Sequence, residues 1–271
     1  MKIKIIKKGL ADSIQNAGNY GLQHIGVQVG GYMDFLSAQL ANKILGNNLH
    51  QNVYELHFPT SHFEFEEDGC IAITGANFIP VINEKSIAMH EIVEIKKGDI
   101  LQFLQPMHGR IAYMAMSYTN SKTSKVNAAF IEQIDSLLFT PAPIRFIPGP
   151  AWNDLEPSSI QTLLHQTFHT TLQSNRMGFQ LEGPTLATIE KKSYLSAGVT
   201  RGTMQLLPNG QIIILMADHQ TIGGYPNLGQ IILVDLPRLA QMVHQTPIHF
   251  RLCNVSTAHE QYQFIQTQFT N

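Results

Sequence analysis

The sequence is short of charge. Only 14% of its 271 residues are charged, and 18 Lys and Arg stand against 20 Asp and Glu, a net charge of −2. An average soluble domain is about 25% charged. Without a basic excess, the chain lacks the electrostatic attraction on which nucleic-acid binding depends. Its polarity comes instead from amides, hydroxyls and 12 histidines.

Long apolar runs and cysteines are also scarce. No apolar run reaches the ~18 residues of a membrane span, and the basic start at residues 1–8 lacks the apolar stretch of a signal peptide. Cys70 and Cys253, the only cysteines, are too few for a disulfide framework and lack metal-ligand spacing. These absences predict a cytoplasmic globular protein without membrane or nucleic-acid partners, and the length predicts one or two domains.

Strand signals dominate the chain. Short β-branched runs are bounded by turn residues such as Gly75 and the Asn-Gly pair at 209–210. Their spacing favours a sandwich or barrel over regular βαβ units. The predicted strands cover residues 1–8, 70–74, 91–95, 100–104, 211–216, 230–234 and 248–252.

Three helices are expected between the strands. Asp34 is a suitable N-cap for a helix over residues 35–45, and Gly46 is a natural stop. A second helix is expected to begin at Ser158 or Ser159, with one apolar face formed by Ile160, Leu163, Leu164 and Phe168. A third is expected from Pro237 through Val243.

The chain is expected to divide into two domains. A polar segment at 118–127 has no apolar period, and two proline pairs follow it, which places the boundary between about 118 and 150. The domains are then 1–125 and 140–271. Residues 26–33 faintly resemble residues 198–204, as two related barrels would produce, although chance would produce it too.

The first segment with potential chemistry is rich in glycine. The segment from Gly18 to Asp34 contains five glycines, Gly18 included, and a helix is expected to begin at Asp34. Glycine lets the backbone approach a ligand closely, and amides at a helix N-terminus favour an anion. The alternative is a set of tight turns in which Asp34 is a simple cap.

Two further segments carry groups suited to catalysis. In residues 174–184, Arg176 offers a planar fork for a substrate carboxylate and Glu182 is a candidate acid or base; alternatively, Arg176 pairs with Glu182 or Asp218 to stiffen a loop. In residues 216–226, Asp218 and His219 follow an apolar strand, and His219 is a candidate base near neutral pH. The alternative is that Asp218 caps a turn and His219 is an exposed loop residue.

His165 and His169 have the i, i+4 spacing of metal ligands on the second expected helix. No third ligand is spaced with them, so we interpret them as its polar face and predict no metal site.

These segments, in this order, carry a resemblance to a known family. Ser-Asn-Arg-Met-Gly at 174–178 and Gly-Gly-Tyr-Pro at 223–226 are the most specific matches, and residues 26–34 and 71–76 add two more. The chain resembles the PxpC/KipA family, the C subunit of bacterial ATP-dependent 5-oxoprolinase. The same domain is called allophanate hydrolase subunit 2, or biotin-dependent carboxyltransferase subdomains A and B. The resemblance covers nearly the whole chain.

The resemblance implies a mostly β fold of two cyclophilin-like β-barrel subdomains with a few short helices. It implies a subunit of a complex that opens 5-oxoproline to glutamate, with ATP used by the complex although no cofactor site is visible in this chain. The implied partners are a B-type (KipI/PxpB-like) subunit and an A-type (PxpA-like) subunit. The candidate catalytic residues are Glu182, Asp218 and His219. The candidate substrate-binding residues are His24, Gly26, Gly30, Gly31, Met33, Asp34, Asn175, Arg176, Met177, Gln220, Gly223, Gly224 and Tyr225.

The chain also departs from the family pattern. Three positions that are usually charged are neutral here, namely Asn16, Asn19 and Ala197. Two other functions therefore stay open beside the 5-oxoprolinase-like one. The first is a biotin-dependent carboxyltransferase or allophanate hydrolase-like subunit, with biotin carried on another protein. The second is a non-catalytic, KipA-like regulatory binding protein.

Overall fold

The computed structural model describes residues 1–117, 126–190 and 193–270. Backbone contacts divide the chain into two compact units. Unit 1 consists of residues 1–18, 34–140 and 268–271, and unit 2 of residues 19–33 and 141–267. Most of the polar segment expected to link two domains, at 118–125, lies outside the described residues.

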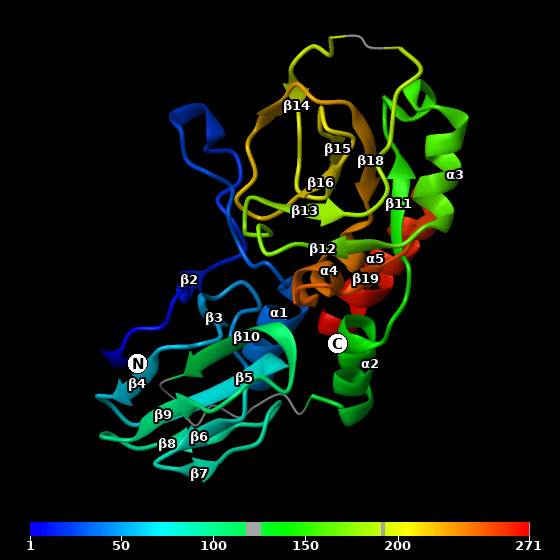
Figure 1. The fold of residues 1–271 in the computed structure, drawn as a ribbon. Coiled ribbons are helices and arrows are strands. Elements are labelled where there is room, and N and C mark those ends of the chain that lie inside the picture. Colours follow the sequence, from blue (N-terminus) through cyan, green and yellow to red (C-terminus); the bar gives the residue numbers. More distant parts are fainter. Residues whose placement is uncertain (118–125, 191–192, 271) are drawn as a thin grey trace. The chain divides into compact units, whose positions relative to one another are not determined.

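Unit 1 contains two five-stranded sheets (Figure 1). The first has the strand order β1-β4-β9-β6-β7 and the second β2-β3-β10-β5-β8. The first sheet is formed by β1 (Ile3–Lys7), β4 (His62–Phe65), β9 (Ile100–Phe103), β6 (Pro80–Ile82) and β7 (Lys85–Ser86). The second is formed by β2 (Ser13–Gln15), β3 (Val53–His57), β10 (His108–Ser117), β5 (Gly69–Asn77) and β8 (Val93–Ile95). Neighbouring strands are antiparallel, as in the pairing of Tyr113 with Thr74.

The core of unit 1 lies between its two sheets. In β4, Phe63 and Phe65 are buried while the alternate residues His62 and Glu64 are half-buried, as the period of two in a strand requires. Side chains from both sheets form one apolar cluster that includes Phe63, Leu101, Leu56, Ile71 and Met114. The two sheets therefore pack face to face.

Helix α1 (Phe35–Ile44) begins and ends as the sequence predicts. The Asp34 carboxylate accepts hydrogen bonds from the Ser37 amide (3.0 Å) and hydroxyl (2.5 Å), and Gly46 adopts a positive φ of 67° at the other end. The Asp34 amide donates to the Tyr113 hydroxyl (2.7 Å), which donates to Glu55 (2.7 Å). Asp34, Tyr113 and Glu55 are fully buried, so this network satisfies polar groups that would otherwise destabilise the unit.

Unit 2 is built on an eight-stranded sheet that curls toward a barrel (Figure 1). Its order is β19-β12-β13-β16-β15-β18-β11-β20, and β14 and β17 form a separate two-stranded ribbon. The mostly β fold and its barrel-like architecture are thus confirmed. The strands are β11 (Ile144–Pro148), β12 (Phe168–Thr170), β13 (Gly178–Glu182), β14 (Ala197–Gly198), β15 (Thr203–Leu206), β16 (Ile212–Leu215), β17 (Ile222–Gly223), β18 (Asn227–Ile231), β19 (Pro247–Ile248) and β20 (Phe250–Leu252).

The second expected helix is shorter than its apolar spacing suggested. Helix α3 spans Pro157–His165, so Phe168 and His169 lie in strand β12 and not on the helix. The i, i+4 interpretation of His165 and His169 was therefore wrong. In addition, Leu163 is buried whereas Ile160 and Leu164 are only half-buried. The third helix, α4 (Leu236–Gln241), begins one residue before the expected Pro237.

Two helices were not anticipated. Helix α2 (Ala128–Phe139) buries Phe130, Ile134 and Leu138 along one face, with the apolar spacing of a helix. A domain boundary was expected here because of the polar segment before it and the proline pairs after it. Helix α5 (Val255–Thr270) follows β20. Short 3₁₀ helices complete the described elements, at Gln23–Ile25 (η1), Trp152–Asp154 (η2) and Leu233–Asp235 (η3). Within the described residues, none of the helices has the length and apolar character needed to cross a membrane.

Helix α2 places an acidic side chain against histidines of unit 1. Asp135 Oδ1 lies 3.6 Å from His90 Nε2, and neither atom has a hydrogen-bond partner among the described residues. Burial raises the pKa of Asp135 to about 6, against the opposing influence of His108. Burial, and then His108, lower the pKa of His90 to about 4. Ionisation of Asp135 is therefore less favourable in the folded protein than in the unfolded chain.

We expect Asp135→Asn to stabilise the protein above pH 6. A carboxyl whose folded pKa is raised costs stability as pH rises from about 4 through 6, and asparagine removes that cost. The half-exposed site limits the gain to about 1–3 °C in the melting temperature at pH 8, with a smaller gain at pH 5. Glu132→Gln, an exposed site on the same helix, is the matched control. An equal effect of both variants at both pH values would contradict this assignment.

Candidate functional site

The glycine-rich segment at residues 19–33, here called the strap, groups with unit 2. Asn19 donates its amide to the Val29 carbonyl (2.7 Å), which closes the segment into a loop. Gly30 and Gly31 have positive φ values of 61° and 92°, which favour glycine because a Cβ would be strained there. In Figure 1 the strap is the blue segment that precedes α1 along the chain. The expected tight backbone turns are therefore present.

Arg176 forms a two-pronged ion pair with Asp218. Its Nε and a terminal nitrogen each lie 2.8 Å from an Asp218 oxygen, and the same terminal nitrogen donates to the Gly31 carbonyl (2.8 Å). Both side chains are mostly buried, with 19% and 28% exposed. Arg176 precedes β13 and Asp218 follows β16, two paired strands, and the Asp218 amide donates to the Arg176 carbonyl (2.8 Å). The pairing left open in the sequence is thus the one observed, and it binds the strap.

A second arginine, which the sequence did not single out, also binds the strap. Arg201 donates to the carbonyls of Tyr32 (2.6 Å) and Met33. Three consecutive strap carbonyls therefore face guanidinium groups. The feature of the sequence that could have identified Arg201 is the faint likeness of residues 26–33 to residues 198–204. Arg201 lies in the second of these segments and contacts the first.

His219 lies next to the ion pair in sequence and is 8% exposed, unlike the exposed loop residue of the alternative interpretation. Its Nδ1 lies 2.6 Å from the Gln220 carbonyl. A carbonyl only accepts, so Nδ1 carries a proton, and in the neutral ring the lone pair is then on Nε2. Asn175 and Met177 flank Arg176, and both are exposed, as is Gln220. The Asn175 side chain accepts from the Met177 amide (2.8 Å) and shapes the turn before β13.

The remaining candidates lie in other segments of the chain. Glu182 is exposed at the far end of β13, six residues from Arg176, or roughly 20 Å along an extended strand. His24 and Gly26 lie in the exposed 3₁₀ turn of the strap, and a Cβ on Gly26 would meet nothing within 4 Å. Met33 is buried at the end of the strap. Asp34 belongs to unit 1, where its carboxylate caps α1.

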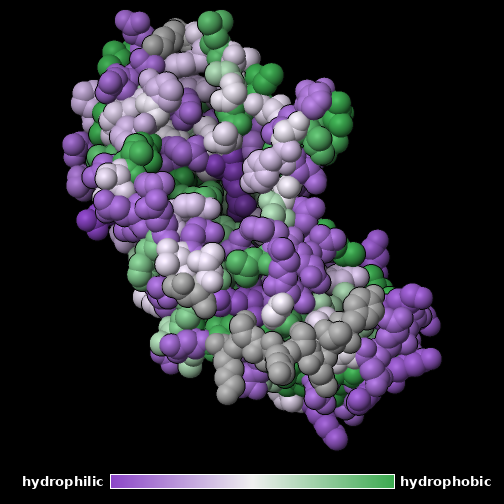
Figure 2. All heavy atoms as spheres, turned by 180° about the vertical axis from the view of Figure 1, so that it is seen from behind, coloured by the Kyte–Doolittle hydropathy of each residue, from purple (hydrophilic) through white to green (hydrophobic). Residues whose placement is uncertain are grey.

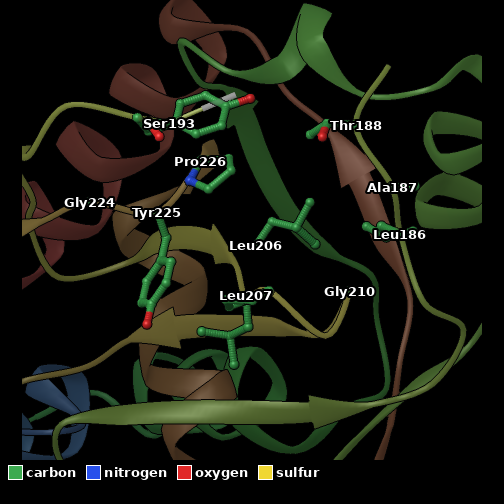
Figure 3. Close-up of a pocket in the computed structure, with 12 residues that line it drawn as sticks. Leu186, Ala187, Thr188, Ser193, Leu206, Leu207, Gly210, Gly224, Tyr225 and Pro226 are labelled. Atoms are coloured by element: carbon green, nitrogen blue, oxygen red, sulfur yellow. The ribbon is translucent and has the colours of Figure 1, made fainter. Parts of the chain in front are cut away.

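The Gly-Gly-Tyr-Pro segment lies beside a cavity of unit 2. The cavity has a volume of about 600 Å³, and Gly224 and Tyr225 line it (Figure 3). Gly223 is buried instead in β17, where an added Cβ would lie 2.4 Å from Gln205 Nε2, so any larger residue would require the Gln205 side chain to move. The loop at 216–226 thus runs from Asp218 at the ion pair to Tyr225 at the cavity.

What this arrangement offers chemically is a set of backbone amide groups held in fixed positions. Two guanidinium groups bind the carbonyls of residues 31–33, which holds the strap amides in place. Pre-positioned amides can stabilise negative charge without reorganisation. The described residues contain no group of three or more His, Cys, Asp or Glu that could hold a metal ion.

Apolar side chains are scattered over the surface. On the side shown in Figure 2, hydrophobic patches alternate with hydrophilic ones. In unit 2 the most exposed are Leu195 (93%) and Leu172 (82%), which lie in different loops. Scattered apolar side chains of this kind are ordinary for a protein surface.

The chain is similar to known proteins along nearly its whole length. The family of the carboxyltransferase domain, subdomain A and B, matches residues 25–121 and 117–252. The C subunit of 5-oxoprolinase from Escherichia coli (strain K12) is 29% identical, over 98% of this chain and 96% of the relative. The protein of the same name from Haemophilus influenzae is 26% identical, over 91% of this chain and 89% of the relative.

The fold is also found in a larger solved structure. The urea amidolyase of K. lactis superposes with a TM-score of 0.86 and 20% identity over 98% of this chain. This chain spans only 20% of that protein. The likeness therefore shows a shared fold within a much longer protein.

We expect the Arg176–Asp218 pair to be coupled energetically. A mostly buried, two-pronged charge pair contributes more than a surface one, so a double-mutant cycle of Arg176→Gln and Asp218→Asn should give a coupling of about 1–2 kcal/mol. Urea unfolding of the four proteins measures it. The exposed pair of Lys4 and Glu64, probed with Lys4→Gln and Glu64→Gln, is the control and should give less than about 0.5 kcal/mol. Additive effects at Arg176 and Asp218 would show that the pair does not hold the site together.

Proposed function

The chain belongs to the family of the carboxyltransferase domain, subdomains A and B, and on that premise we propose that it is the C-type subunit of a 5-oxoprolinase-like complex. The proposed complex opens 5-oxoproline to glutamate at the expense of ATP. The proposal is carried by how much of each chain is matched as well as by the sequence identity. This chain and the C subunit of the Escherichia coli 5-oxoprolinase match almost end to end, whereas urea amidolyase is several times longer.

The proposed reaction sets clear physical demands. A lactam is a poor acyl electrophile, and transfer of the terminal phosphoryl group of ATP to its oxygen makes the ring carbon attackable. One water then adds to that carbon, and the ring C–N bond breaks to give a free amine and a glutamyl phosphate. A second water hydrolyses this acyl phosphate to glutamate and phosphate, and ADP is left from the first step. The protein must bind an acidic substrate and stabilise negative charge on the lactam oxygen.

We assign these tasks to the strap and its anchors. The amides of Gly30 and Gly31 stabilise the developing charge, and Arg176 and Asp218 keep them in position through the Gly31 carbonyl. Arg176 and Arg201 bring two guanidinium groups to the strap, and positive charge at that place favours an acidic substrate. His219 supplies the base through its Nε2 lone pair.

The other expected members of the site have supporting roles in this proposal. Met33, Asn175, Met177 and Gln220 border the anchored strap or its arginine, and Glu182 remains a separate candidate acid at the end of β13. The partners are a B-type subunit and an A-type subunit, and ATP is bound in the assembled complex, in the cytoplasm. Two relatives are named as the C subunit of 5-oxoprolinase, which supports such an assembly.

Two other functions each have one supporting observation. The fold shared with urea amidolyase favours a carboxyltransferase or allophanate hydrolase-like subunit. The uncharged Asn16, Asn19 and Ala197, at positions where the family pattern has charged residues, favour a regulatory binding protein. Asn16 accepts from the Gly18 amide (2.8 Å), and Ala197 lies exposed in β14.

The test is ATP-dependent glutamate release from 5-oxoproline by this chain purified together with its A- and B-type neighbours. Release should require this chain, and Arg176→Ala should lower it at least about tenfold, because the strap loses its anchor while the complex still assembles. Arg251→Ala, an exposed arginine of unit 2 on strand β20, should leave the rate unchanged.

Co-elution of the complex is followed alongside the rate. An intact complex that releases no glutamate would refute the ring-opening activity and favour another amide substrate or the regulatory role. A normal rate with Arg176→Ala would remove Arg176 from the site.

A further inference from the structure

We propose that the cavity of unit 2 is a second binding site, which takes an uncharged cyclic amide carrying an apolar substituent. Its volume is about 600 Å³, within the range that encloses a drug-sized ligand. The inference stands on the lining of the cavity and does not depend on the ring-opening activity. Arg176, Asp218 and His219 do not line the cavity, so it is separate from the anchored strap.

The described lining carries no charged side chain. Its apolar wall includes Leu186, Leu206, Leu207 and Pro226, and Figure 3 shows Leu206 and Leu207 together at the centre of the view. Moving a carboxylate from water to such a wall is costly unless a partner compensates it, whereas an uncharged amide loses much less. The lining therefore favours a neutral ligand with apolar surface.

One polar group of the lining, the Thr188 hydroxyl, favours an N–H donor. The Thr188 hydroxyl donates to the Glu190 carbonyl (2.9 Å), so its proton is engaged and its oxygen presents lone pairs. In Figure 3 the Thr188 hydroxyl lies at the upper right of the view and the Ser193 hydroxyl at the upper left. An oxygen whose proton is engaged can only accept a further hydrogen bond. The N–H of a cyclic amide meets this requirement, and a carboxylate does not.

The walls are fixed before a ligand binds. Leu207 and Gln211 are joined by a backbone hydrogen bond (2.8 Å) across the turn between β15 and β16. Gly210 within that turn has a φ of 80°, and its carbonyl accepts from the Leu186 amide (2.9 Å). The turn therefore ties two walls of the cavity together. A preformed cavity binds with less loss of conformational entropy than one that must order on binding.

The test is isothermal titration of the full chain with two probes that share a lactam ring. N-benzyl-5-oxoprolinamide is uncharged and carries an apolar ring, and 5-oxoproline carries a carboxylate. The neutral probe should bind saturably, and at least tenfold more tightly than the free acid. Equal or tighter binding of the free acid, or no binding of the neutral probe, would overturn the proposal.

Three variants locate the binding. Ala187→Trp places a bulky ring in the cavity from an exposed position and should weaken the neutral probe at least tenfold. Ile189→Trp, exposed and outside the lining, is the matched control and should bind as the parent does. Thr188→Val removes the acceptor with little change of shape and should weaken the probe about fivefold.

Melting temperatures show whether each variant is folded. Unchanged affinity in folded Ala187→Trp would place the probe elsewhere and overturn the assignment of the cavity. Unchanged affinity in Thr188→Val would refute the selection for an N–H donor. Glutamate release by the assembled complex is measured separately, so failure of this site and failure of the ring-opening activity are distinguishable.

Discussion

The site of unit 2 depends on one interaction, the ion pair of Arg176 and Asp218 with its extension to the Gly31 carbonyl. A glycine-rich segment has high conformational freedom, and on its own it would not hold its amides in one direction. The guanidinium group, itself fixed by Asp218, restricts that freedom. Arg201 continues the same contact at Tyr32 and Met33. Two charged side chains thus convert a flexible segment into a fixed arrangement of backbone groups.

Each buried carboxylate of this chain, in which few residues are charged, needs a hydrogen-bond partner. Asp235 is fully buried and accepts two hydrogen bonds from the Arg145 side chain, and that pairing raises the pKa of Arg145. Glu55 is fully buried and accepts from Tyr113. Buried carboxylates persist in a fold only when such partners compensate for the lost water. Asp135 of α2 lacks that compensation, which explains its raised pKa.

The strap and the cavity, both in unit 2, differ in the kind of chemical group that they favour. The strap site combines two arginines with an aspartate and pre-positioned amides, whereas the described lining of the cavity is uncharged. An acidic group is therefore favoured at the strap, and a neutral ring in the cavity. The loop at 216–226 joins the two, since Asp218 lies at one end of it and Tyr225 at the other.

The sequence by itself determined the mostly β fold, the helix that Asp34 caps and the family, because these depend on local periodicity, caps and motifs. It placed Arg176 and Asp218 in the candidate site but left the partner of Arg176 open. Only the tertiary structure decided that partner, because pairing of β13 with β16 brings together residues 42 positions apart. The tertiary structure also separated Glu182 from Arg176, brought Arg201 to the strap and ended α3 before Phe168. Local patterns carry no information on such distances, since strand pairing and packing set them.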